Sequence, residues 1–164
     1  MKYIVLTVLL FFTSCSYKHD SLYISSKKTT EQSVANTKKT QILKNGKVKI
    51  FVTVTYLNSL KNQKIIDKKK EQFIVGFYFV NFGTKEINKV LNLKDVKFSI
   101  EDETHLISVK KLKPSSPILQ IIPASNPWSQ YFLVQTPKIS KNSITFSLKV
   151  DSYKKAVLKF EKNY

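Results

Sequence analysis

Hydrophobic and polar residues alternate along most of the chain after residue 40, with the period of two that is typical of half-buried β-strands. The clearest example is the run VKIFVTVTYL at residues 48–57. The residues that share one face of this run are Val48, Ile50, Val52, Val54 and Tyr56. The preceding KNGK at residues 44–47 is a tight-turn signal, so TQIL at residues 40–43 is expected to pair back as a short strand.

Further apolar runs follow at regular intervals. FIVGFYFVNFG at residues 73–83 is apolar on both faces, as expected of a central strand, and Gly76 within it indicates a bulge or a close approach. A long polar loop is expected before it, at residues 58–72. The other expected strands are residues 95–100, 105–112, 129–136, 143–150 and 155–160. The first two of these are expected to form one hairpin, around residues 101–104, and the last two a second.

About eight short strands without a long helix predict an all-β sandwich of seven to eight antiparallel strands. The stretches VTVTYLN, EQFIVGFYFVN, NPWSQYFLVQTP and ITFSLKV together resemble the single immunoglobulin-like sandwich of small Gram-negative lipoproteins. The resemblance covers about residues 40–161 and implies no enzymatic activity. The chain departs from antibody domains because Cys15 is its only cysteine and its single tryptophan, Trp128, comes late. We therefore expect a variant of this topology in a domain at residues 40–164.

The first 14 residues have the pattern of a signal peptide. Lys2 is followed by an apolar run at residues 3–12, which is too short to span a bilayer, where about 20 apolar residues are needed. The sequence FTSC at residues 12–15 resembles a bacterial lipobox, although Phe12 stands where leucine is usual. That resemblance implies lipidation of Cys15, which would explain a lone thiol in an oxidising compartment. The alternative is an ordinary secretory signal with a cysteine near its cleavage site.

Lipidation would fix the protein to a membrane without a spanning helix. Two acyl chains hold a protein firmly where one does not. Residues 15–39 are polar, and we expect them to form a flexible tether that reaches about 25–30 Å. In Gram-negative lipoproteins, aspartate after the cysteine directs retention at the inner membrane. Ser16 stands there instead, so the resemblance favours the outer membrane, with the domain in the periplasm or at the surface.

The charge of the chain bears on its partners. The formal net charge is +17, and every basic residue is lysine. Arginine, which best recognises phosphates and base edges in pairs of hydrogen bonds, is absent. Together with export, this argues against nucleic acid and favours an envelope protein or an anionic envelope polymer, lipopolysaccharide or lipid head group. The alternative is a surface on which the lysines serve only solubility.

The sequence offers little catalytic or metal-binding chemistry. His19 lies in the expected tether and His105 beside a turn, neither with the spacing of metal ligands. The acidic residues at 101–103 could offer oxygen ligands to calcium, but they lack the glycine-bearing loop of such sites. There is also no nucleophile elbow or glycine-rich phosphate loop. We therefore expect no catalytic residues, no metal and no cofactor. A wall-modifying hydrolase would need His105 close to a carboxylate and a serine.

One stretch stands out as a candidate contact site. In PASNPWSQYF at residues 123–132, two prolines frame a loop that carries Trp128. Rigid loops on a sandwich often bind partners, and Trp and Tyr dominate binding hot spots. Pro127, Trp128 and Tyr131 are the expected contact residues. The alternative, preferred on the sequence alone, is that Trp128 fills one end of the core.

The expected function is that of a lipid-anchored cell-envelope protein acting as a non-enzymatic binding or structural module. The main alternative is a periplasmic assembly chaperone that uses an exposed sheet edge. An uncovered edge would favour the chaperone, whereas lysines along the edge would indicate protection against pairing.

Overall fold

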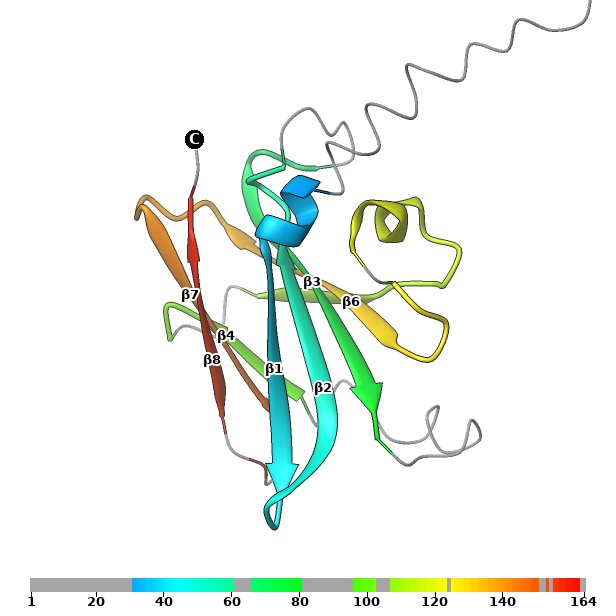
Figure 1. Cartoon of the computed structure of the whole chain (residues 1–164). Coiled ribbons are helices and arrows are strands. Elements are labelled where there is room, and N and C mark those ends of the chain that lie inside the picture. The colour runs from blue at the N-terminus through cyan, green and yellow to red at the C-terminus, as the bar shows by residue number, and fades with distance from the viewer. Residues whose placement is uncertain are drawn as a thin grey trace, which may run out of the picture.

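The computed structural model describes residues 31–60, 66–80, 96–102, 107–123, 125–150, 153 and 155–162. A short helix at residues 31–35 precedes the first strand, and a 3-10 helix, η3 (Pro117–Ile121), lies between the fifth and sixth strands (Figure 1). No helix in these parts of the chain is long and apolar enough to cross a membrane. The strands are β1 (Thr37–Lys44), β2 (Lys47–Tyr56), β3 (Lys70–Phe79), β4 (Val96–Ile100), β5 (Ser108–Lys111), β6 (Gln130–Pro137), β7 (Ser143–Val150) and β8 (Ala156–Glu161).

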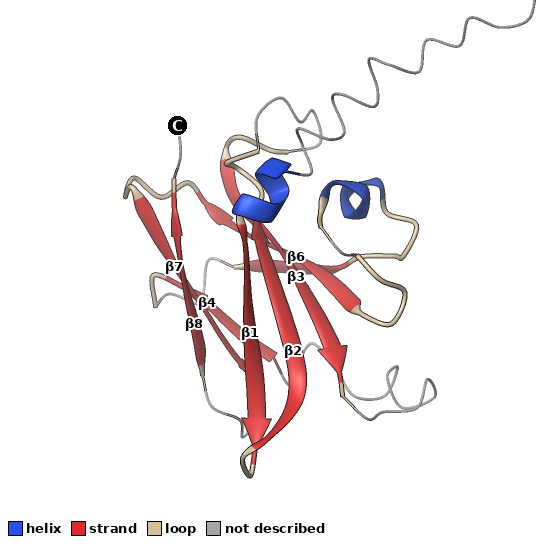
Figure 2. Ribbon diagram, viewed as in Figure 1, coloured by secondary structure: helices blue, strands red, loops and turns tan. Residues whose placement is uncertain are grey.

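The strands form two antiparallel sheets, which confirms the expected all-β sandwich (Figure 2). The larger sheet has the order β1-β2-β3-β6-β5 and the smaller one the order β4-β7-β8. An immunoglobulin constant-type sandwich has strands ABED in one sheet and CFG in the other. The order β2-β3-β6-β5 with β4-β7-β8 reproduces that arrangement, and β1 is an added strand beside β2.

Both hairpins at the ends of the domain form as the sequence predicts. Asn45 and Gly46 join β1 to β2 with φ angles of 52° and 74°. Two successive residues in the left-handed region are the signature of the type I′ turn, for which Asn-Gly is the preferred sequence. At the other end, β7 pairs with β8 in a regular register from Ser143 opposite Glu161 to Leu148 opposite Ala156.

The folded domain includes residues before the boundary expected at residue 40. Polar side chains that suggested a tether make hydrogen bonds here instead. The Thr37 hydroxyl donates to the Ser33 carbonyl at 2.7 Å, and the Asn36 side-chain amide donates to the Gln32 carbonyl at 2.8 Å. These bonds join the short helix to the start of β1, so residues 31–39 belong to the folded unit.

The hairpin expected around residues 101–104 is wrong. β4 pairs with β7 in the smaller sheet, whereas β5 pairs with β6 in the larger one. Glu101 and Asp102 follow β4 with φ angles of 52° and 65°, which turns the chain out of its sheet. The Thr145 backbone N–H donates to Glu101 Oε1 at 2.6 Å and fixes this corner to β7. The chain therefore crosses between the sheets here, as strands C and D do in an immunoglobulin domain.

Aromatic rings join the two sheets across the core. Phe73 on β3 lies 4.9 Å from Phe146 on β7, measured between ring centroids, and 5.6 Å from Phe160 on β8. In antibody domains a disulfide joins the corresponding strands B and F. Aromatic pairs in tilted or edge-on arrangements such as these add about 0.5–1.5 kcal/mol per pair beyond their buried area.

A second apolar cluster covers the outer face of the larger sheet. It consists of Leu57, Leu60, Ile66, Ile74, Ile118, Leu119, Ile122 and Tyr131. The apolar run at residues 118–122 is the main source of this cover, and most of it forms η3. Because β3 contacts the core on one side and this cluster on the other, it is buried on both faces, as its sequence predicts.

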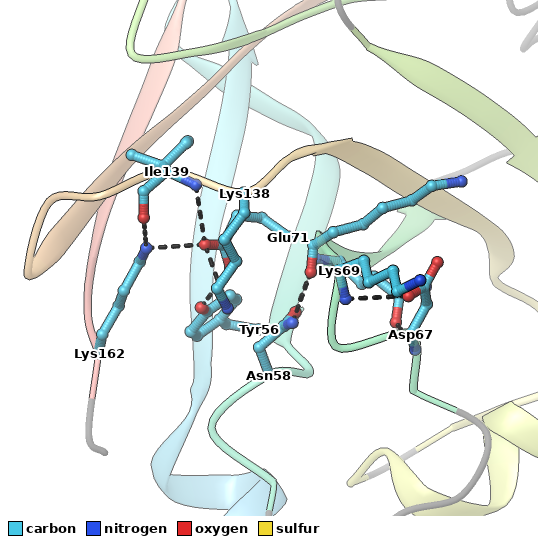
Figure 3. Close-up of polar contacts among 10 residues, drawn as sticks. Tyr56, Asn58, Asp67, Lys69, Glu71, Lys138, Ile139 and Lys162 are labelled. Atoms are coloured by element: carbon cyan, nitrogen blue, oxygen red, sulfur yellow. Dashed lines mark hydrogen bonds and ion pairs between the residues drawn. The ribbon is translucent and has the colours of Figure 1, made fainter.

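A buried carboxylate, Glu71 at the start of β3, joins four segments of the chain (Figure 3). The Tyr56 hydroxyl donates to its Oε2 at 2.6 Å, and the Ile139 backbone N–H donates to its Oε1 at 3.2 Å. The Lys162 ammonium lies 2.7 Å from the same Oε1 and also donates to the Ile139 carbonyl. The side chains of Glu71 and Lys162 are 0% and 2% exposed. We call this group, Tyr56, Glu71, Ile139 and Lys162, the Glu71 clamp.

The clamp keeps Glu71 ionised. Burial by itself raises the pKa of a carboxyl, but hydrogen bonds from Lys162, Tyr56 and Ile139 and the charge of Lys138 together hold the pKa of Glu71 below its ordinary value of 4.5. Its contribution to stability is therefore fully present above that ordinary value. It is lost as the pH falls through the lower pKa of the folded state.

Replacing Glu71 with glutamine tests the clamp. Glu71→Gln leaves the Lys162 ammonium buried without its counter-charge, so the free energy of unfolding at neutral pH should fall by about 3–5 kcal/mol. Urea denaturation between neutral and acid pH measures this and should show a shallower acid decline in the variant. Glu161→Gln, in an exposed pair with Lys159 at 3.5 Å, is the control and should change stability by about 0.5 kcal/mol or less. Equal effects of the two substitutions would contradict the clamp.

Candidate functional site

The loop between η3 and β6 borders a cavity with a volume of about 520 Å³. The loop leaves the outer face of the larger sheet on the side that η3 covers (Figure 1). The cavity lining includes Lys111, Leu112, Leu119, Asn126, Trp128 and Tyr131. It thus combines apolar walls, one ammonium group and several amide and hydroxyl groups, the mixture that ligand-binding cavities commonly have.

Asn126 organises the loop. Its side-chain oxygen accepts a hydrogen bond from the Trp128 backbone N–H at 3.1 Å, which is an Asx turn around Pro127. Its own backbone N–H donates to the Tyr131 hydroxyl at 2.9 Å. The loop is therefore attached to β6 through the Tyr131 hydroxyl, and the backbone of Trp128 is fixed in a hydrogen-bonded turn.

Gly76 explains why Tyr131 can lie where it does. The two residues are opposite each other in the register of β3 and β6, which is regular through this point. A Cβ atom at Gly76 would lie 2.7 Å from Tyr131 Cε1 and 2.7 Å from Thr53 Oγ1. Only a glycine leaves room for the ring, so the close approach expected from the sequence is confirmed and β3 has no bulge at Gly76.

The three expected contact residues have different environments. Trp128 is 58% exposed, so the interpretation that it fills one end of the core is wrong. Pro127 is also exposed. Tyr131 is only 7% exposed, because its ring packs over Gly76 and its hydroxyl holds the loop. Tyr131 therefore lines the cavity and supports the loop, while Trp128 is the side chain that a partner can reach.

Two further aromatic residues share this outer face, and the sequence pattern did not single them out as contact residues. Phe51 on β2 and Tyr78 on β3 are opposite each other in the ladder, with ring centroids 6.3 Å apart, and each is 40% exposed. Tyr78 directly follows Phe77, whose ladder partner is Gln130, so it lies near the Trp128 loop. Both alternate with buried residues, which is the signal that could have found them. We call Phe51, Tyr78 and Trp128 the aromatic face.

Comparison with known proteins gives no relative that could assign a role to this surface. No family model matches the chain, and no curated protein matches it significantly.

The acidic residues considered as calcium ligands are paired with lysines. Glu101 contacts Lys141 and accepts the Thr145 N–H, which together lower its pKa, and Asp102 lies 2.9 Å from the Lys155 ammonium. Within the part of the chain that the structure describes, no three His, Cys, Asp or Glu side chains are grouped in a way that could hold a metal ion. Cys15, His19, Glu103 and His105 lie outside the described residues.

The four edge strands all carry exposed lysines. These are Lys38, Lys39 and Lys44 on β1, Lys97 on β4, Lys110 and Lys111 on β5, and Lys159 on β8. β5 is also only four residues long. Short, lysine-bearing edges are a common protection against pairing with another chain. The edge strands therefore do not favour the alternative of an assembly chaperone that pairs with its partner through an exposed sheet edge.

Removing the Tyr131 hydroxyl tests how the loop is held. Tyr131→Phe keeps the ring over Gly76 but leaves the Asn126 N–H without its acceptor, so stability should fall by about 0.5–1.5 kcal/mol. Because Trp128 is the only tryptophan, its fluorescence anisotropy reports the loop directly and should decrease. Tyr78→Phe, at an exposed position on the same face, is the control and should change neither quantity. An unchanged anisotropy in Tyr131→Phe would show that the loop does not depend on this bond.

Proposed function

We propose that the protein is an exported, lipid-anchored binding module of the cell envelope whose contact surface is the aromatic face with its cavity. The observation that carries the proposal is the 58% exposure of Trp128 beside the 520 Å³ cavity. Large exposed aromatic side chains lower the solubility of a protein, but on a loop fixed by hydrogen bonds they are typical of binding hot spots.

The make-up of the cavity is suited to binding a partner. The lining offers an ammonium group at Lys111, amides at Asn126 and Gln130, and the indole of Trp128. These groups can hold a partner with negative charge or hydrogen-bonding groups, such as an envelope protein or an anionic envelope polymer.

Membrane attachment rests on the sequence FTSC at residues 12–15 and on the single cysteine it contains. The FTSC stretch resembles a lipobox, and this resemblance implies a diacylglyceryl group on Cys15 and cleavage that removes residues 1–14. Attachment to the outer membrane, favoured by Ser16, would hold the sandwich close to anionic head groups and envelope polymers.

Metabolic labelling tests the anchor. Labelled palmitate should enter the wild-type protein, and Cys15→Ala should abolish the labelling and release the protein from the membrane fraction, because one residue carries the attachment. Trp128→Ala is a matched control that should label normally. Equal labelling of Cys15→Ala and wild type would contradict a lipid anchor at this residue.

Truncating Trp128 tests the contact surface. Trp128→Ala should change the free energy of unfolding by only about 0.5 kcal/mol, because the side chain is exposed, whereas truncating a buried aromatic costs about 3–5 kcal/mol. Retention of partners in pull-downs from cross-linked envelopes should fall. Val157→Ala, which shortens a 56% exposed apolar side chain on β8, is the control and should retain them. Loss of the same partners from both variants, or from neither, would contradict a specific role of the aromatic face.

A further inference from the structure

Three lysines form a row across the outer face of the smaller sheet. Lys97 on β4 is directly opposite Lys149 on β7. Lys155 immediately precedes Ala156, which is opposite Leu148, so it continues the row beside Lys149 on the β8 side. All three are exposed, and the residues that alternate with them, such as Phe98 and Leu148, face the core.

Stability of the fold does not explain this row. Like charges directly opposite each other on neighbouring strands destabilise a sheet. Among the described residues, one carboxylate engages the row, since Asp102 Oδ1 lies 2.9 Å from the Lys155 ammonium. Asp95 and Asp151 lie outside the described residues. A bound anion would relieve the repulsion between Lys97 and Lys149.

Hydroxyl groups accompany the lysines. A hollow of about 170 Å³ is bordered by the three lysines and Ser99. Ser99 is opposite Ser147 in the ladder, one row further along the same face. Ser147 is 1% exposed and does not border the hollow, so Ser99 is the hydroxyl that a ligand in the hollow can reach.

We propose that this lysine row, Lys97, Lys149 and Lys155 with Ser99, binds a phosphate group. Lysine ammonium groups act as point charges toward phosphate, and the Ser99 hydroxyl can donate to one of its remaining oxygens. A phospholipid head group and free inorganic phosphate share this chemistry.

The site is separate from the aromatic face. It lies on the smaller sheet, whereas the Trp128 loop and η3 lie on the far side of the larger one (Figure 1). A protein attached to a membrane could thus bind phosphate groups with one sheet and keep its aromatic face available to another partner. Substitutions that abolish binding at one site should therefore leave binding at the other unaffected.

Titration of the full-length Cys15→Ala chain, which carries no lipid of its own, tests the proposal. Inorganic phosphate is followed by calorimetry, and co-sedimentation is measured with phosphatidylcholine vesicles with and without phosphatidylglycerol. Lys97→Gln with Lys149→Gln should weaken phosphate binding about tenfold or more, because two charge-assisted contacts are lost. The control, Lys39→Gln with Lys110→Gln, removes the same charge from the larger sheet and should weaken it by about twofold or less.

Ser99→Ala distinguishes a specific phosphate site from general attraction to positive charge. It alters no charge, and it should weaken phosphate binding because one hydrogen-bond donor at the hollow is lost, while stability in phosphate-free buffer should stay nearly unchanged. Binding to phosphatidylglycerol vesicles that phosphate displaces would identify a lipid head group as the ligand, and phosphate binding without vesicle binding would identify a soluble anion. Equal weakening by both lysine pairs, or unchanged phosphate binding in Ser99→Ala, would overturn the proposal.

Discussion

One buried charge fixes how the two sheets meet. The Glu71 carboxylate at the start of β3 receives hydrogen bonds from Tyr56 at the end of β2, from the backbone after β6 and from Lys162 after β8. Neither Glu71 nor Lys162 can be exposed to water without opening this end of the sandwich, and Lys162 cannot lose Glu71 without leaving an uncompensated buried charge. The C-terminal residues are therefore as much a part of the fold as the central strand.

The position of the aromatic face depends on the same strand. The clamp and the core rings fix the register of β3 on its inner side, and that register places Gly76 under the ring of Tyr131 on its outer side. Tyr131 then holds Asn126, and Asn126 holds the turn that presents Trp128. A chain of direct contacts thus runs from the buried charge to the exposed indole. The lysine row is placed instead by the ladder of β4, β7 and β8 and by the bond from the Lys155 ammonium to Asp102.

The parts of the fold that depend on local pattern could be predicted. Alternation identifies β2 and β7, and Asn45-Gly46 predicts the turn between β1 and β2, because both signals lie within a few residues of the structure they specify. The hairpin proposed after β4 was wrong because contacts distant in sequence decide the pairing there, such as that of Glu101 with Thr145.

The candidate site was only half predictable for a similar reason. The prolines identified the Trp128 loop, but the exposure of Trp128 follows from Tyr131 and Gly76, which meet only in the folded protein. The burial of Glu71 was equally hidden, since it stands between Lys70 and Gln72 in a polar stretch.

The pair of Phe73 and Phe146 has a consequence for where the domain can form. With Cys15 as its only cysteine, the chain cannot close a disulfide within itself, and rings join the strands that cystine joins in antibody domains. Ring packing does not depend on the redox potential of the compartment, whereas cystine does. The stability of the sandwich therefore does not depend on whether its surroundings are reducing or oxidising. The domain also needs no thiol oxidase or disulfide isomerase to reach its native state.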